Sequence, residues 1–260
     1  MKVLPAVAAL IVALSLAACE KGADGKTVLN LRKPDAAFGA KVRAYLLEHP
    51  EVIEEAVTKL QEKKQAEAMA ASKADLAAAR QAIPLHRAAL EQDPRDFVAN
   101  PNGSVTVVQF FDYNCGYCKL AAPQIVQLIQ EHPDVRFVFK EFPIFGEASD
   151  SAAKISLTAA GKARGLELYQ AWMAEKPLDE AAIDRRLTGL GLDPAGLRKA
   201  AQTPEIAKQV ADVRALAMAL KIQGTPAFII GDTLIPGADM EAVKAAIAQA
   251  KAGGKKVAEG

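Results

Sequence analysis

The chain has 260 residues, of which 51% are hydrophobic and 24% are charged. This length allows a sizeable core and more than one domain. The formal net charge is only +1, and no basic run or cluster of stacking aromatic residues is present, so nucleic acid is not expected as a partner.

Residues 1–19 have the pattern of a signal peptide. A short positive start precedes an apolar run at residues 3–18, which is shorter than the roughly 20 residues of a membrane-spanning helix. The sequence LAAC at its end resembles the lipobox of bacterial lipoproteins, so Cys19 is a candidate for lipidation. Ordinary cleavage after Ala17 is the alternative. In both cases we expect export to the periplasm, where disulfides persist.

Residues 20–34 are polar and contain glycine, which predicts a flexible tether. Two helices are expected in residues 35–60, because apolar side chains recur at helical spacing on both sides of Pro50. The two apolar stripes consist of Phe38, Val42, Tyr45 and Leu46, then Val52, Ile53, Ala56, Val57 and Leu60. Two short stripes cannot form a stable domain alone. We therefore interpret this segment as a helical hairpin that makes a homo-oligomer.

Residues 61–80 are rich in alanine and charge, so they have high helix propensity but little apolar surface to bury. They predict a semi-rigid stalk, which with the hairpin forms an N-terminal region at residues 35–82. The alternative is that hairpin and stalk both pack against the rest of the chain.

Residues 83–252 have the pattern of an α/β domain. The expected elements before its centre are a helical stretch at 85–93, a short strand at 97–99, a hairpin turn at Asn102-Gly103, a buried strand at 105–111, a helix at 119–130 and a strand at 135–140. The order strand, helix, strand predicts a right-handed parallel crossover.

An all-helical insertion is expected at about residues 149–221. Asp193-Pro194 and Thr203-Pro204 are each typical of an N-cap followed by proline in the first helical turn. Trp172 is expected in the core. The α/β pattern resumes with a strand that begins at Pro226, a partner strand at 233–235 and a closing helix at 240–250, and residues 253–260 form a polar tail.

The sequence Cys115-Gly116-Tyr117-Cys118 lies between the buried strand and the following helix. At a helix N-terminus, unpaired N–H groups and the helix dipole stabilise a thiolate. In such motifs the first cysteine has a pKa lowered to roughly 3.5–7.5, and the second can attack a mixed disulfide formed by the first. The pattern therefore predicts dithiol–disulfide exchange.

Metal binding is the competing interpretation of these thiols. Zinc needs a second pair of ligands, and His49, His86 and His132 are scattered singly. Cu(I) could use two thiolates, but no methionine flanks them. We expect no metal and no cofactor.

These motifs together carry a family resemblance. The CGYC sequence, the helical insertion and Thr225-Pro226 at the start of a strand resemble the thioredoxin fold of the periplasmic disulfide-bond proteins. The insertion is similar to DsbA, whereas Gly116-Tyr117 and Thr225 are similar to DsbC and DsbG. The N-terminal hairpin, and the KEFP sequence that starts at Lys140, look most like the ScsC (suppressor of copper sensitivity C) family.

The resemblance implies that Cys115 and Cys118 are catalytic, that Gly116 and Tyr117 tune the cysteine pKa, and that Pro226 is cis beside the thiols. Thr225 would bind substrate backbone as an added strand. One position departs from the family pattern: the buried acid often found six residues before the first cysteine is Gln109 here. Asp112 or Glu141 could replace it.

The expected function is that of an oligomeric protein disulfide isomerase acting on exported proteins with disulfides. A membrane thiol reductase would keep its cysteines reduced. Three alternatives stay open: a DsbA-like dithiol oxidase, a Cu(I)-binding module for copper tolerance, and an anchored scaffold whose helical hairpin is the functional part.

Overall fold

The structure is a computed structural model that describes residues 35–258. The predicted signal peptide, tether and lipidation site at Cys19 lie outside the described residues. The chain divides into two compact units, Met1–Lys64 and Gln65–Gly260, and each is described by itself. None of the helices in the described part of the chain is long and apolar enough to cross a membrane.

The first unit contains helix α1 (Ala36–Glu48) and the start of helix α2 (Glu51–Ala82). Asp35 caps α1, because its carboxylate accepts the backbone N–H of Ala37 at 3.0 Å. No residue of α1 is buried. The predicted apolar stripes are exposed on both helices, as Phe38 (63% exposed) and Ile53 (52% exposed) illustrate.

Helix α2 is continuous over 32 residues, so the alanine-rich tract is helical as predicted. Its C-terminal part belongs to the second unit. There Ala79 is fully buried, and Ile83 in the following 3-10 helix η1 (Ile83–His86) is buried as well. Helix α3 (Arg87–Glu91) completes the helical stretch expected near this point. The domain boundary at residue 82 stays a prediction.

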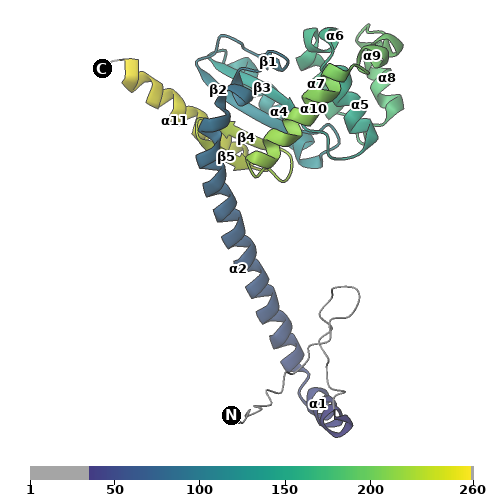
Figure 1. Ribbon diagram of the computed structural model, residues 1–260, viewed down its shortest axis with the longest axis vertical. Helices are drawn as coiled ribbons and strands as arrows, with labels where there is room; N and C mark the ends of the chain where they lie inside the picture. The colour runs from purple at the N-terminus through teal and green to yellow at the C-terminus, as the bar shows by residue number, and fades with distance from the viewer. Residues whose placement is uncertain (1–34, 259–260) are drawn as a thin grey trace, which may run out of the picture. The chain divides into compact units, whose positions relative to one another are not determined.

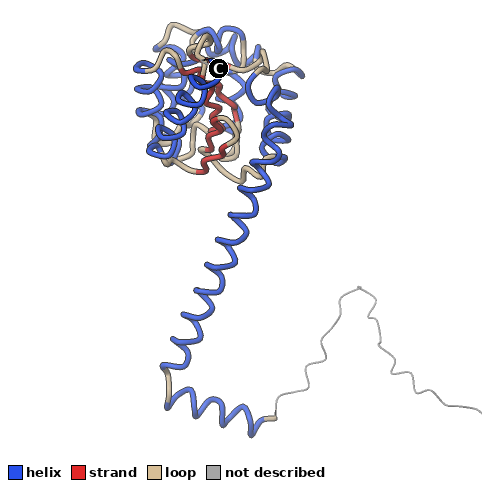
Figure 2. Tube along the Cα trace, turned by 90° about the vertical axis from the view of Figure 1, so that its left-hand side faces the viewer, coloured by secondary structure: helices blue, strands red, loops and turns tan. Residues whose placement is uncertain are grey.

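The second unit is built on a five-stranded sheet, which helices enclose (Figures 1 and 2). The strand order is β1-β3-β2-β4-β5, with β1 (Phe97–Ala99), β2 (Val105–Phe111), β3 (Val135–Glu141), β4 (Ala227–Ile230) and β5 (Thr233–Pro236). Strands β2 and β3 are parallel and the other pairs are antiparallel. The predicted parallel crossover and the α/β class are therefore confirmed.

The predicted hairpin at Asn102-Gly103 is wrong. Strand β1 pairs with β3, not with β2, and Val98 lies opposite Val138. The turn instead brings the chain against the start of β3, where a Cβ at Gly103 would lie 2.4 Å from the backbone nitrogen of Arg136. Glycine is needed here for close backbone approach rather than for a hairpin turn.

Both faces of the sheet are buried, which explains why its central strands read as continuous apolar runs. One face, with Val107 and Phe137, packs in a core shared with helices α4 (Gly116–Glu131) and α11 (Met240–Ala258). The other face, with Val108 and Val138, packs against Leu90 of α3 and helix α10 (Pro204–Ala219). Helix α11 continues past its predicted end at residue 250.

Six helices separate β3 from β4, which confirms the helical insertion. They are α5 (Glu147–Ser156), α6 (Ala159–Ala163), α7 (Gly165–Met173), α8 (Glu180–Gly189), α9 (Pro194–Ala200) and α10 (Pro204–Ala219). Asp193 and Thr203 cap α9 and α10 as predicted. Trp172 of α7 is fully buried and belongs to the core, also as predicted.

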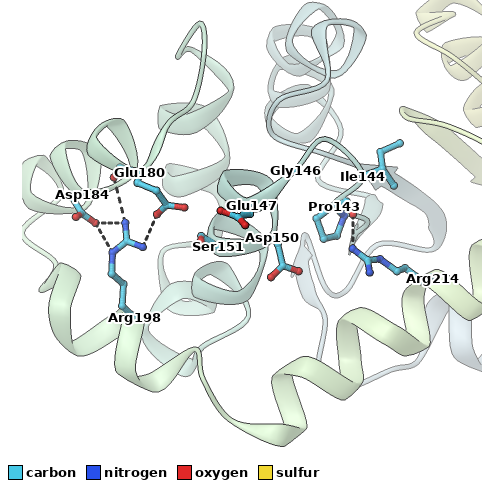
Figure 3. A pocket seen from close by; sticks show the side chains of 10 residues that line it. All are labelled: Pro143, Ile144, Gly146, Glu147, Asp150, Ser151, Glu180, Asp184, Arg198 and Arg214. Carbon is cyan, nitrogen blue, oxygen red and sulfur yellow. Dashed lines mark hydrogen bonds and ion pairs between the residues drawn. The ribbon is translucent and has the colours of Figure 1, made fainter.

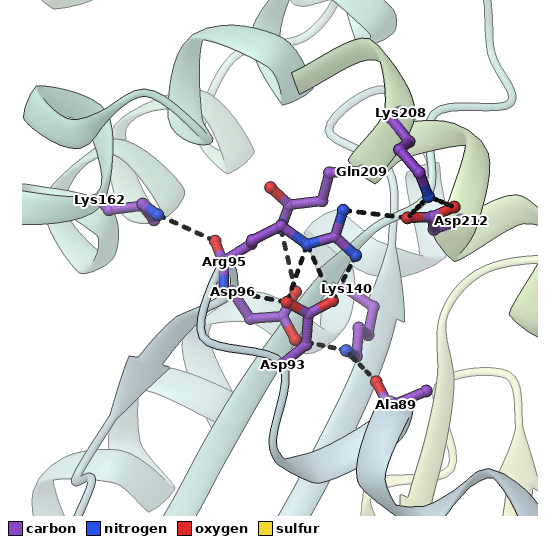
Figure 4. Close-up of polar contacts among 9 residues, drawn as sticks. All are labelled: Ala89, Asp93, Arg95, Asp96, Lys140, Lys162, Lys208, Gln209 and Asp212. Atoms are coloured by element: carbon purple, nitrogen blue, oxygen red, sulfur yellow. Dashed lines mark hydrogen bonds and ion pairs between the residues drawn. The ribbon is translucent and has the colours of Figure 1, made fainter. Parts of the chain in front are cut away.

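A buried ion pair ties the loop before β1 to the sheet and to α10 (Figure 4). The Lys140 ammonium contacts the Asp96 carboxylate and donates to the carbonyl of Ala89 at 2.6 Å. Gln209 of α10 donates to the other Asp96 oxygen at 3.2 Å. Burial raises the pKa of Asp96, an effect that the charge of Lys140 opposes. The charges are paired because isolated ions inside a protein are costly.

Candidate functional site

The two thiols lie where β2 ends and α4 begins. Cys115 is the N-cap of α4, and its Sγ accepts the backbone N–H of Cys118 at 3.4 Å. Asp112 shapes the approach to this turn, because its carboxylate accepts the N–H of Asn114 at 2.6 Å and that of Ile144 at 2.7 Å. The predicted strand–turn–helix position of the thiols is therefore observed.

Cys115 is in an environment that favours its thiolate. The pKa of Cys115 is lowered to about 6, first by hydrogen bonding from the Cys118 thiol and then by the Thr225 side chain and the N–H groups of Cys118 and Tyr117, although burial opposes this. A thiolate at a helix N-terminus also gains from the helix dipole. Of the two thiols, Cys115 is therefore the one that ionises more readily at neutral pH.

Cys118 behaves in the opposite way. It is fully buried, and burial is the main cause that raises its pKa far above the usual value. Both cysteines are free thiols in this structure. At neutral pH the Cys115 sulfur thus ionises readily, whereas Cys118 stays a protonated donor.

Thr225 and Pro226 lie beside the thiols, far from them in sequence. The Thr225–Pro226 peptide bond is cis, as the resemblance implied. The Cys115 thiol donates to the carbonyl oxygen of Thr225 at 3.1 Å. The Thr225 hydroxyl is buried but makes no hydrogen bond of normal geometry. A second cis bond, Lys176–Pro177, was not predicted, and it lies in the same site.

A cavity of about 810 Å³ lies beside Cys115 and Thr225, and we call it the thiol cavity. Cys115, Tyr117, Leu120, Phe145 and Thr225 contribute to its lining. Tyr117 and Leu120 are about two-thirds exposed, at 67% and 65%. The sequence did not predict that Leu120 and Phe145 belong to the site. Leu120 lies outside the apolar stripe of its helix, and an apolar side chain there could have indicated a binding surface.

Gln109 of β2 stands at the position where the family often has a buried acid, and its side chain is uncharged. It is buried, and its side chain exchanges hydrogen bonds with the Tyr169 hydroxyl at 3.2 and 3.3 Å. The pKa of Tyr169 is raised by burial, so this hydroxyl also stays protonated. The position of the family's buried acid is thus occupied by a neutral polar pair.

Glu141 is a buried carboxyl near this pair. Its Oε1 accepts hydrogen bonds from the Tyr113 hydroxyl at 2.9 Å and from the Ser156 hydroxyl at 2.5 Å. Its second oxygen, Oε2, has no hydrogen-bond partner among the described residues. Burial raises the pKa of Glu141 to about 8. Of the two acids proposed as substitutes, Glu141 can therefore hold a proton at neutral pH, and Asp112 is instead committed to backbone N–H groups of the turn.

A larger cavity, of about 850 Å³, lies elsewhere on the insertion (Figure 3). Its charged side chains are mostly paired: Arg198 contacts Glu180 and Asp184, and Arg214 donates to the carbonyl of Pro143 at 2.8 Å. No cysteine or histidine lines it. We assign the candidate functional site to the thiol cavity, because there, within the part of the chain that the structure describes, a thiol with a lowered pKa lines an open space.

The described residues contain no group of three or more His, Cys, Asp or Glu that could hold a metal ion. The three histidines lie apart in the chain: His49 and His132 are the C-caps of α1 and α4, and His86 is the last residue of η1. The site combines a readily ionised thiol, a buried protonated thiol and the backbone carbonyl of Thr225, an arrangement that can carry out thiol–disulfide exchange.

Family models match two parts of the chain. The DSBA-like thioredoxin domain matches residues 106–248, and the copper resistance protein ScsC N-terminal domain matches residues 35–67. Two curated relatives are Na⁺/H⁺ antiporters NhaA of Salinispora tropica and Salinispora arenicola, 29% and 28% identical over 65% and 62% of this chain. The chain spans only 27% and 26% of the length of those relatives.

Three solved structures are similar over nearly their whole length. A thioredoxin-like oxidoreductase from Silicibacter pomeroyi is 37% identical, with a TM-score of 0.60, over 64% of this chain and 97% of that one. ScsC of Proteus mirabilis in a transitional conformation is 32% identical, with a TM-score of 0.59, over 84% and 99%. The thiol-disulfide exchange protein alpha-DsbA2 of Wolbachia pipientis is 27% identical, with a TM-score of 0.61, over 66% and 95%.

The comparisons confirm the predicted thioredoxin fold with its helical insertion, and the N-terminal match to ScsC confirms the resemblance that the hairpin carried. The DSBA-like model matches more than half of the residues of this chain, so the chain belongs to the DsbA-like thioredoxin domain family.

Proposed function

We propose that this protein is a thiol–disulfide oxidoreductase with Cys115 as its nucleophile. The observation that carries the proposal is the contrast between the two sulfurs: the pKa of Cys115 is lowered to about 6, whereas that of Cys118 is raised by burial. The Cys115 thiolate forms a bond with one sulfur of a client disulfide, and the other client sulfur leaves as a thiolate. Cys118 can then attack Cys115, which releases the client reduced and leaves the pair oxidised.

Within this activity we favour disulfide isomerisation over net oxidation. In isomerisation a client thiolate, rather than Cys118, attacks the mixed disulfide, so the client is rearranged and the pair ends reduced. This route needs reduced cysteines at the start. A membrane thiol reductase would supply the electrons when Cys118 resolves the intermediate instead. The clients would be exported proteins in the periplasm, in keeping with the leader at residues 1–19.

An oligomer supports isomerisation, because several sites around one client raise the effective concentration of thiolate. The first unit has the surface for it: Phe38, Tyr45 and Val57 are 63%, 55% and 47% exposed. Large exposed apolar side chains at helical spacing on both helices favour a partner of the same kind. We propose that a second copy of the segment at residues 35–60 covers them.

Refolding of a client with scrambled disulfides tests the activity. The full chain should restore client activity in a redox buffer, and Cys115→Ala should remove this ability. Rapid oxidation of a reduced client, without repair of the scrambled one, would favour the dithiol oxidase. Tight stoichiometric Cu(I) uptake without refolding activity would favour the copper module.

Sedimentation of the secreted form tests the oligomer. Tyr45→Asp combined with Val57→Asp should lower the sedimenting mass to that of one chain and reduce isomerisation, while exchange with a small disulfide continues. Ala66→Asp, also exposed but outside the two stripes, should leave the mass unchanged. A chain that is monomeric before any substitution contradicts the proposal.

A further inference from the structure

A second groove lies on the other side of the cis-proline loop from the thiol cavity. It has a volume of about 470 Å³, within the range of ligand-binding clefts. One wall comes from the loop before β4, from Lys221 to Pro226, and from the end of β5. The opposite wall is the C-terminal part of helix α2, which runs beside β4 and β5 in Figure 1. We call it the α2 groove.

The wall on α2 is one regular face of the helix. Its residues recur at helical spacing and are Ala68, Ala71, Ser72, Asp75 and Leu76. Most are small, so the helix and the loop do not fill the space between them. The two walls are joined at one rim, where the Gln223 amide donates to the Asp75 carboxylate at 2.9 Å. Ala79, further along the same face, is fully buried and anchors the helix.

Thr225 connects this groove to the thiol cavity, because it lines both. Its N–H makes no backbone hydrogen bond among the described residues. Buried polar groups are rarely left unpaired in a protein that has no ligand to bind there. The junction of the two spaces thus offers one backbone donor, the N–H of Thr225, to an extended chain that lies across it.

We propose that the α2 groove is the second half of the client-binding site and that α2 selects the client segment next to the reacting cysteine. The proposal rests on the proposed function, since it extends the client from Thr225. An extended chain advances about 3.3 Å per residue, so a client with its cysteine at Cys115 reaches the groove within a few residues.

The lining indicates which segment fits. The groove contains one carboxylate, Asp75, and one ammonium, Lys221, so its charges balance. The remaining surface is largely apolar and includes Ile222, Ala227 and Leu234. The occupant is therefore an extended, uncharged client segment with small apolar side chains. Leu76 is the largest side chain on the α2 wall, so segments with small side chains should fit better there than segments with large aromatic ones.

Two substitutions at adjacent positions of α2 test this. Ala71→Trp fills the groove, whereas Ala70→Trp adds the same side chain on the opposite side of the helix. Each full-length variant, reduced, is mixed with a disulfide peptide whose cysteine is flanked by alanine and valine, and separately with the small disulfide 5,5′-dithiobis(2-nitrobenzoate). Ala71→Trp should slow the peptide reaction by about 10-fold or more, as one badly placed apolar group does in a pocket. Its rate with the small disulfide should match that of the parent protein.

The small disulfide separates the two possible failures. If the parent protein does not react with it, the proposed oxidoreductase activity fails. If Ala71→Trp reacts with both compounds like Ala70→Trp does, the groove proposal is overturned. Leu76→Ala gives a test that needs no added bulk: it should raise the rate with a phenylalanine-flanked peptide relative to the alanine-flanked one. An unchanged ratio also overturns the proposal.

Discussion

The backbone N–H of Cys118 donates to the sulfur of Cys115 at 3.4 Å, so one cysteine helps to ionise the other. The Cys118 thiol lowers the pKa of Cys115 further, to about 6. Because Cys118 is itself fully buried, its own proton stays in place. The two thiols of one short motif thereby acquire opposite protonation states at neutral pH.

The first prediction follows from this division of roles. Cys118→Ser keeps the backbone N–H and a hydroxyl donor, so Cys115 should still attack a client disulfide. The mixed disulfide should then accumulate, because the resolving thiol is missing. Non-reducing electrophoresis after acid quenching measures it. Cys115→Ser should give no adduct; an adduct formed through Cys118 would contradict the assignment of the nucleophile.

The second prediction concerns Glu141, whose pKa is raised to about 8 from an ordinary value of 4.5. Between these values the folded protein holds a proton that the unfolded chain has released. The free energy of unfolding therefore decreases with rising pH over this window, by about 1.4 kcal/mol per pH unit at most. Glu141→Gln removes this effect. Its stability relative to the parent protein should rise steadily between pH 5 and pH 8, measured by urea unfolding.

A constant difference between Glu141→Gln and the parent protein across that range would show that Glu141 ionises normally. Tyr113→Phe is the useful companion variant, because it removes one hydrogen bond to Glu141 without removing the carboxyl. It should lower stability at every pH and retain the slope of the parent protein.

The third prediction concerns the buried pair of Lys140 and Asp96. Lys140→Met leaves a buried carboxylate without its cation, which should cost about 3–5 kcal/mol in the free energy of unfolding. Lys140→Met combined with Asp96→Leu should recover much of this loss, because no buried charge is then left. Urea unfolding of the three proteins measures both steps. If the double variant is no more stable than the single one, the charge pair is not the cause.

The fourth prediction uses two helical glycines. A Cβ at Gly161 would lie 2.3 Å from the carbonyl oxygen of Ile155, whereas a Cβ at Gly189 meets nothing within 4 Å. Gly161→Ala should therefore destabilise the protein by roughly 1–3 kcal/mol. Gly189→Ala should be neutral or stabilise it by up to about 1 kcal/mol. Thermal unfolding of the two variants makes the comparison; equal effects would contradict the close packing at α6.

The sequence was sufficient for those features that depend on local patterns. The CGYC motif lies between an apolar run and a helical stripe, and this position predicted that Cys115 lies at the start of α4. Asp193 and Thr203, each followed by proline, predicted where α9 and α10 begin. The continuous apolar run at residues 105–111 predicted a buried strand, and the structure has one there in β2. In these cases the determining interactions lie within a few residues of one another.

Features that depend on distant packing were missed or misjudged. Asn102-Gly103 has hairpin chemistry, but β1 gains its partner in β3, which follows a whole helix later. The contribution of Phe145 to the thiol cavity depends on how the insertion folds back, which no periodicity reports. The raised pKa of Glu141 likewise comes from its burial in the folded protein, which outweighs the lowering effect of the hydrogen bonds from Ser156 and Tyr113, and not from its own sequence context.

The most direct test of the account is a titration of Cys115 in the reduced, full-length protein, with Cys118→Ser as a second sample. The rate of alkylation by iodoacetamide, followed from pH 4 to pH 10, should rise through an apparent pKa close to 6, the value that its surroundings give. A rate that rises only near pH 9, the ordinary pKa of a cysteine thiol, would contradict the proposed thiolate and the function built on it.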